Sequence, residues 1–138
     1  LVALGSMVAP ALSAADSLAL LGIEAMVLDA RFAKPLDARL VSQAALSTGR
    51  VLTIEENVLS GGFGSQVLAL LSRLRPELRV GCVGIPDEFV EQGSQEGLRR
   101  MCHLDANGMV SEVRRFFPEL FNERGCFPVA LDRTGQQP

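Results

Sequence analysis

The chain has neither tryptophan nor tyrosine and only one histidine, and each shortage excludes a class of function. Aromatic residues make up 5% and the formal net charge is -3, so there is little to stack on bases and no cation excess to attract phosphates. Nucleic acid is therefore not an expected partner. The single histidine, His103, has no second histidine and no partnered serine nucleophile near it, so it builds neither a metal site nor a catalytic triad.

Cysteine and long hydrophobic runs are also scarce. Cys82, Cys102 and Cys126 are odd in number and far apart, which fits neither a disulfide framework nor a CxxC metal or redox pair. No apolar run approaches the roughly 20 residues that cross a bilayer, and the start lacks the charged region of a signal peptide. We expect a cytoplasmic domain with reduced thiols and no membrane partner. Because the chain begins inside an apolar run without an initiator Met, we also expect a fragment of a longer polypeptide.

Core-forming material, by contrast, is plentiful. Hydrophobic residues make up 48% of the 138 residues and charged residues 21%, which predicts one compact domain. Short apolar runs that predict strands alternate with segments of helical period. After an apolar run ended by Gly5, the expected strands cover 23–30, 50–56 and 78–85. The expected helices end at Gly22, cover 37–48, end before Pro76, and cover 94–101 and 106–117.

This alternation predicts an α/β fold. Strand–helix–strand crossovers form a mainly parallel sheet with helices on both faces, which is a three-layer arrangement. In the first helix, which Ser6 is expected to cap, the predicted buried face holds Val8, Leu12, Ala15, Leu18 and Ala19. In the helix before Pro76 it holds Val67, Leu68, Leu71 and Leu74.

The loop in IEENVLSGGFGSQV (54–67) has two interpretations. Backbone N–H groups at a helix start, approached through glycines, can hold a phosphate. However, a dinucleotide motif that starts at Gly62 and Gly64 has Val67 at its third glycine position, and no GK[ST] follows. The favoured interpretation is a tight strand-to-helix turn, in which Gly61, Gly62 and Gly64 supply unusual backbone angles and Ser65 lies near the cap.

Several polar residues are expected at the carboxyl ends of the strands, where open α/β domains place ligands. Adjacent strand residues point to opposite faces, so Glu55 and Glu56 cannot easily converge on one reacting atom, and we expect one at an interface and the other in solvent. The residues expected near this edge are Asp29, Arg31, Glu56 and Asn57. For Glu56 and Asn57, a contact with another domain or subunit and a purely local role in the turn stay equally open.

The cations favour solvated or interdomain faces over substrate binding. Arg31 and Lys34 flank Phe32 just before a proline turn. Two arginine doublets lie on short predicted helices, and a solvated face is expected for Arg99, Arg100, Arg114 and Arg115. The residues taken alone therefore define no catalytic, cofactor-binding or metal site. The rim or interface candidates are Arg31, Lys34, Glu55, Glu56, Asn57, Gly61, Gly62, Gly64 and Ser65.

Three segments carry a resemblance to a known family. LDARFAKPLD (28–37), VLTIEENVLSGGFGSQV (51–67) and VGIPDEFVEQGSQEGLRRMCHLDANGM (83–109) resemble the C-terminal domain of the 1-deoxy-D-xylulose-5-phosphate synthase family, in the transketolase superfamily. The C-terminal domains of transketolase and of the 2-oxoacid dehydrogenase β subunits share the proline-Leu-Asp turn and the paired glycines, but not GIPDEFVEQGSQ followed by LDANGM. His103 departs from the family, which usually has glycine before Leu-Asp-Ala.

The resemblance covers residues 1–117 and implies a transketolase C-terminal-like domain of about five strands, with 118–138 as a partly frayed extension. Family members condense pyruvate with glyceraldehyde 3-phosphate for isoprenoid, thiamine and pyridoxal synthesis, using thiamine diphosphate and Mg²⁺. The family's Gly-Asp-Gly cofactor motif and its activating Glu belong to other domains, so no cofactor is expected here. The implied role is support: packing against the parent chain and a second copy in a homodimer. The alternatives are a partner-docking C-terminal domain of a 2-oxoacid dehydrogenase β subunit or of a transketolase, and a free-standing anion or nucleotide binder.

Overall fold

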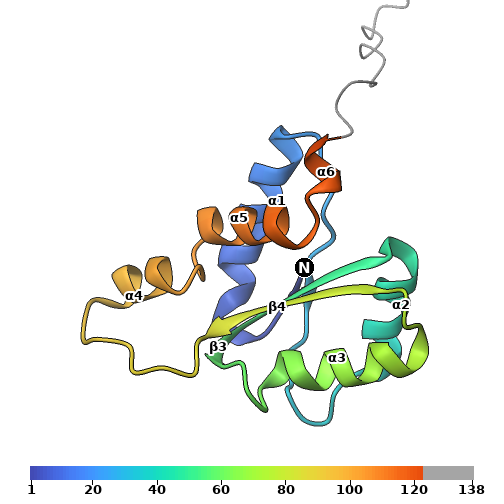
Figure 1. Cartoon of the computed structure of the whole chain (residues 1–138), viewed down its shortest axis with the longest axis horizontal. Coiled ribbons are helices and arrows are strands. Elements are labelled where there is room, and N and C mark those ends of the chain that lie inside the picture. The colour runs from blue at the N-terminus through green and yellow to red at the C-terminus, as the bar shows by residue number, and fades with distance from the viewer. Residues whose placement is uncertain (123–138) are drawn as a thin grey trace, which may run out of the picture.

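A four-stranded parallel sheet runs through residues 1–122, the part of the chain that the computed structural model describes (Figure 1). The strand order is β2-β1-β3-β4, and every neighbouring pair is parallel. In chain order the elements are β1 Val2–Ala3, the 3-10 helix η1 Gly5–Met7, α1 Val8–Leu20, β2 Leu28–Asp29, α2 Ala38–Thr48, β3 Arg50–Val58, α3 Phe63–Leu74, β4 Arg79–Ile85, α4 Gln95–Met101, α5 Ala106–Phe116 and α6 Glu119–Asn122.

Helices cover both faces of this sheet. Alternate residues of β3 point in opposite directions, so Val51 packs with α2 and α3 while Leu52 packs with α1 and α5. The core is therefore divided into two apolar clusters, one on each side of the strands. The α/β class and the three-layer arrangement are confirmed, with four strands among the described residues where about five were expected.

Local chemistry sets both ends of α2 where the sequence predicted them. The Asp37 carboxylate accepts the Leu40 N–H at 2.9 Å and begins α2, and Gly49 ends it in the left-handed region at φ 70°. The predicted helix over 37–48 is thus confirmed to within a residue. Ser6 behaves differently: its hydroxyl donates to Glu56 at 2.6 Å, so the predicted cap is wrong.

Two other predictions needed information that the local sequence does not hold. The expected strand over 23–30 shrinks to Leu28–Asp29, because its partner β1 offers only two residues to pair with. On α1 the predicted buried face is partly wrong: Leu18 is buried as expected, whereas Leu12 is 52% exposed. The buried positions of this helix are Ala11, Ala14 and Leu18.

The predicted face of α3 is half right. Val67 and Leu71 are buried as expected, whereas Leu68 and Leu74 are exposed. The helix buries Phe63 and Gly64 in their stead, both in its first turn.

The pairing of β3 with β4 is irregular near its carboxyl end. Ile54 pairs with Val83 and Val58 with Ile85, so β3 advances four residues while β4 advances two. The extra length of β3 holds Glu55 and Glu56 and carries them beyond the regular part of the sheet.

The first residues of the expected extension pack on the domain. Glu119, in α6, accepts from Arg50 at 2.8 Å and pairs with Arg79 at 2.6 Å, at the amino ends of β3 and β4. Leu120 and Phe121 pack against the cluster under α1 and α5. The predicted fraying concerns residues 123–138, which lie outside the described residues, as does Cys126.

Candidate functional site at the carboxyl ends of the strands

The carboxyl rim, defined here as residues 29–34 and 55–65, contains all the rim or interface candidates that the sequence analysis named. β2 leads into Asp29 and Arg31, while β3 leads through Glu55 and Glu56 into the glycine loop and α3. Strand alternation places the two glutamates on opposite faces, as predicted. Each of them has a specific partner within the domain.

Glu55 is fully buried, with 0% of its surface exposed, and it caps α3. Its Oε2 accepts the Phe63 N–H at 2.7 Å and its Oε1 accepts the Gly64 N–H at 2.8 Å. The free N–H groups of a helix start favour an anion, and here the chain supplies that anion itself. An external phosphate would have to displace a buried carboxylate, so these residues do not fit a diphosphate.

The glycines make room for this carboxylate. A Cβ on Gly62 would meet the Val58 carbonyl oxygen and lie 2.5 Å from Glu55 Oε2, and one on Gly64 would lie 2.5 Å from Thr53 Oγ1. Gly61 serves the turn itself, with φ 73° and open space around it. The Ser65 hydroxyl donates to the Gly62 carbonyl at 2.7 Å. The predicted tight turn is present, but only Gly61 supplies an unusual backbone angle; Gly62 and Gly64 have no positive φ and are needed for space instead.

Glu56 lies on the other face and ties α4 to the sheet. Arg99 donates to its two oxygens at 2.8 and 2.9 Å, in a bidentate pair, and the Ser6 hydroxyl donates to Oε2. The Arg99 hydrogen bonds, together with the one from Ser6, lower the pKa of Glu56 to about 2. The solvated face expected for Arg99 is wrong, since its side chain contacts a residue 43 positions away.

The cations after β2 lie on the surface. Arg31 adopts φ 55°, and its backbone N–H donates to the Asp29 carboxylate at 2.9 Å. Its side chain, that of Lys34 and that of Asn57 are exposed, and no partner is found for them among residues 1–122. A cavity of about 150 Å³ lies beside Arg31, lined mainly by apolar residues of β2, the following loop and α2.

His103 has a structural partner that the sequence did not reveal. Its Nδ1 lies 2.7 Å from Oε1 of the buried Glu112, whose Oε2 accepts from Arg115 at 2.8 Å. Burial by itself raises the pKa of Glu112, but the hydrogen bonds from Arg115 and His103 outweigh it and hold that pKa below its ordinary value. His103 has φ 59°, a backbone angle that glycine adopts more easily. The family resemblance gave a hint of this backbone angle, because the family usually has glycine at the position of His103.

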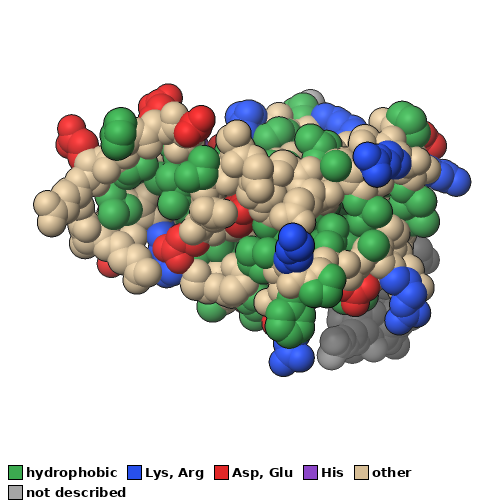
Figure 2. All heavy atoms as spheres, turned by 90° about the horizontal axis from the view of Figure 1, so that it is seen from below, with side chains coloured by type: hydrophobic (Ala, Val, Ile, Leu, Met, Phe, Trp, Pro, Cys, Tyr) green, Lys and Arg blue, Asp and Glu red, His purple; other side chains and the backbone are tan. Residues whose placement is uncertain are grey.

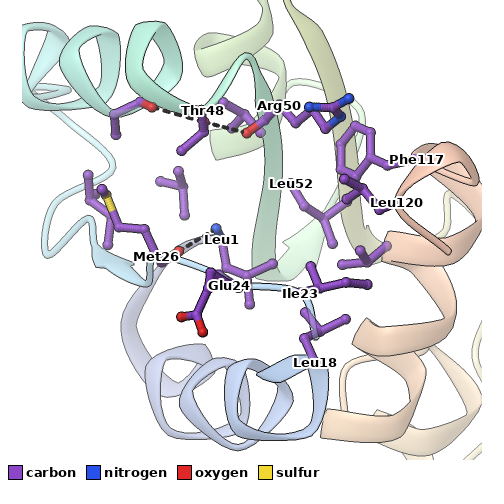
Figure 3. Close-up of a pocket in the computed structure, with 16 residues that line it drawn as sticks. Leu1, Leu18, Ile23, Glu24, Met26, Thr48, Arg50, Leu52, Phe117 and Leu120 are labelled. Atoms are coloured by element: carbon purple, nitrogen blue, oxygen red, sulfur yellow. Dashed lines mark hydrogen bonds between the residues drawn. The ribbon is translucent and has the colours of Figure 1, made fainter. Parts of the chain in front are cut away.

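A larger cavity, of about 240 Å³, opens at the amino ends of the strands (Figure 3). Leu18, Leu52 and Phe117 are among its mainly apolar walls, and the Leu1 ammonium donates to the Met26 carbonyl at 2.7 Å. The cavity lies at the opposite end of the sheet from the carboxyl rim, and its described walls contain no nucleophile paired with a base.

Among residues 1–122, no group of three histidine, cysteine or acidic side chains is placed to hold a metal ion. Burial raises the pKa of the Cys82 thiol, which makes its thiolate less available. In the same part of the chain no helix is long and apolar enough to span a membrane.

Fold and rim together define a parallel α/β domain in which Glu55 and Glu56 hold the domain's own elements together. The chain belongs to the transketolase C-terminal domain family, whose model, described as "Transketolase, C-terminal domain", matches residues 1–109.

Curated relatives agree with the resemblance found in the sequence. The chain is 50% identical over 117 residues to 1-deoxy-D-xylulose-5-phosphate synthase 1 of Geobacter sulfurreducens, covering 84% of this chain and 18% of the relative. The enzyme of the same name from Geobacter metallireducens is 48% identical over 117 residues, covering 84% and 19%. The Syntrophotalea carbinolica synthase is 46% identical over 123 residues, covering 89% and 19%. The chain thus spans about a fifth of the length of these relatives.

A solved structure described as "Split gene transketolase, inactive beta4 tetramer" has the same fold. It superposes with a TM-score of 0.79 at 39% sequence identity, covering 85% of this chain and 38% of that one. The expected transketolase C-terminal-like fold is confirmed.

Proposed function

We propose that the chain is the C-terminal, non-catalytic domain of a 1-deoxy-D-xylulose-5-phosphate synthase. The synthase would condense pyruvate with glyceraldehyde 3-phosphate in the cytoplasm, with thiamine diphosphate and Mg²⁺ bound by its other domains. The observation that carries the proposal is the 50% identity to a synthase over 117 residues, which include the whole carboxyl rim.

In this proposal the domain supports the active site mechanically. Glu55 already accepts the N–H groups at the start of α3. This supports a rim that holds its own shape and does not bind the diphosphate of the cofactor. The exposed residues of the rim, Arg31, Lys34, Asn57 and Gly61, then contact the parent chain and a second copy of it in a homodimer. Exposed polar side chains such as these suit the polar rim of an interface.

A graft tests the proposal directly. Residues 1–117 replace the matching region of the Geobacter sulfurreducens synthase, and formation of 1-deoxy-D-xylulose 5-phosphate from pyruvate and glyceraldehyde 3-phosphate is measured. We expect activity from the graft and none from the chain alone. An inactive but folded and assembled graft contradicts the assignment, as does calorimetric binding of thiamine diphosphate and Mg²⁺ to the isolated chain.

A variant pair tests the supporting role within the active graft. Gly62→Leu forces a side chain into the Glu55 carboxylate and should reduce dimerisation or retention of thiamine diphosphate. Gln66→Leu, on the exposed side of α3, is the matched control and should leave both unchanged. Equal dimerisation and equal retention of thiamine diphosphate in the two variants would contradict the proposed supporting role of the domain.

One observation favours a second candidate. The 39% identity to the split gene transketolase makes a transketolase C-terminal domain the alternative. The same graft made in that transketolase separates the two, because the proposed function requires activity in the synthase and not in the transketolase.

A further inference from the structure

The segment after β4 is an exposed acidic arm, defined as residues 86–101. None of its residues is buried, and the Phe89 side chain stands wholly in solvent. Asp87, Glu88 and Glu91 surround this phenyl ring in the sequence, and no cation pairs with them among residues 1–122. The bidentate Glu56–Arg99 pair fixes the base of the arm to the carboxyl rim.

The opposite edge of the sheet holds a cavity that matches this arm. The basic socket is the cavity of about 150 Å³ after β2, with Leu28, Phe32, Leu36, Leu40 and Val41 among its apolar walls. A cavity of about 150 Å³ with apolar walls is large enough for a benzene ring. Arg31 lines the socket, and Lys34 and Arg39 are exposed on the same loop and on the first turn of α2.

Two carboxylates also line the socket, but both are engaged locally. Asp29 accepts the Arg31 N–H and Asp37 accepts the Leu40 N–H. The three cations have no such partners among the described residues. The three cations outnumber the two carboxylates by one, so the socket offers an acidic ligand a small excess of positive charge around an apolar space for a ring.

We propose that the acidic arm of one copy of this chain inserts Phe89 into the basic socket of a second copy. Asp87, Glu88 and Glu91 then face Arg31, Lys34 and Arg39 across the interface. The inference deepens the homodimer packing assigned to the carboxyl rim under the proposed function and rests on it.

The positions of the two patches suit a closed dimer. The arm follows β4 and the socket follows β2, the two outer strands of the sheet, which lie three strand spacings, about 15 Å, apart. Figure 2 shows acidic with apolar side chains at the left end of one face, and basic side chains beside apolar ones nearer its middle. A two-fold axis through that face brings each arm onto the other copy's socket, and both contacts form at once.

Sedimentation of the 138-residue chain over a range of concentrations tests the inference. We expect a reversible dimer that weakens as salt is added, because exposed charge pairs are screened. Phe89→Ala should weaken it about 10- to 100-fold, the effect of losing one buried aromatic ring. Leu20→Ala is the matched control, since Leu20 is 91% exposed at the end of α1, and it should change nothing.

Charge reversal identifies the partners. An arm variant (Asp87→Lys, Glu88→Lys, Glu91→Lys) and a socket variant (Arg31→Glu, Lys34→Glu, Arg39→Glu) should each be monomeric alone, because like charges then face each other. In a mixture of the two, both contacts regain opposite charges and a heterodimer should form. Far-UV circular dichroism verifies that each variant is folded.

Three outcomes would overturn the inference: a wild-type chain that stays monomeric, a dimer that Phe89→Ala leaves intact, or reversed variants that do not associate when mixed. An active synthase graft with a monomeric chain would refute the interface alone. A dimeric chain with an inactive graft would refute the proposed function alone.

Discussion

Replacing Glu55 with Gln should destabilise the domain strongly, although the two side chains have the same shape. The carboxylate accepts two N–H groups, at 2.7 and 2.8 Å, in a fully buried site. An amide keeps one acceptor and turns its own NH₂ group toward the other N–H, so a buried donor is left unsatisfied at a cost of about 1–3 kcal/mol. The lost charge at the helix start adds about 0.3–1 kcal/mol, and the remaining bond becomes weaker.

These contributions amount to a loss of about 3 kcal/mol, which for a domain of this size lowers Tm by roughly 10 °C. Urea denaturation followed by far-UV circular dichroism measures it, since the chain has no tryptophan or tyrosine to report by fluorescence. Glu56→Gln is the matched control, because it removes a partly exposed pair with Arg99 and should cost less than about 1 kcal/mol. Similar losses in the two variants would refute the account of Glu55 as the buried cap of α3.

Three further predictions concern the rim and the turn before α5. Gly61→Ala should cost about 1 kcal/mol for its left-handed angle, whereas Gly62→Ala should cost at least about 3 kcal/mol because it displaces the Glu55 carboxylate; comparable values from denaturation would contradict this. The pKa of Glu56 falls from 4.5 to about 2 on folding, so its stabilisation is complete above pH 4.5 and is lost as the pH falls to about 2. The stability difference between wild type and Glu56→Gln should shrink over that window, and a difference that stays constant from pH 4.5 down to pH 2 would disagree. His103→Gly should be more stable than His103→Ala by about 1 kcal/mol, because both lose the Glu112 contact and only alanine keeps the backbone strain; thermal denaturation compares them.

Features set by neighbouring residues were predictable from the sequence. Asp37 and Gly49 bound α2 because a cap and a left-handed stop act within one turn of the chain. The opposite orientations of Glu55 and Glu56 also followed from the two-residue period of a strand.

Features set by distant partners were not predictable in the same way. The length of β2 depends on the two residues that β1 offers for pairing. The face of α1 that turns inward carries the small Ala11 and Ala14, which are buried, while the larger Leu12 is exposed. The cap of α3 by Glu55 spans eight residues, and the contact of Glu56 with Arg99 spans 43. Only the folded sheet brings these pairs together.

The irregular pairing near the end of β3 has a consequence for how this domain can vary. Between the pairs Ile54–Val83 and Val58–Ile85, β3 contains two residues more than β4, and two is an even number. Side chains beyond the irregularity therefore keep the same inward and outward assignment as those before it. Insertions after Glu56 should therefore be tolerated in pairs, because they lengthen the rim, leave Glu55 in place and keep both helix layers in contact with the same residues. A change of one residue would exchange the two faces from there onward and expose apolar side chains to water.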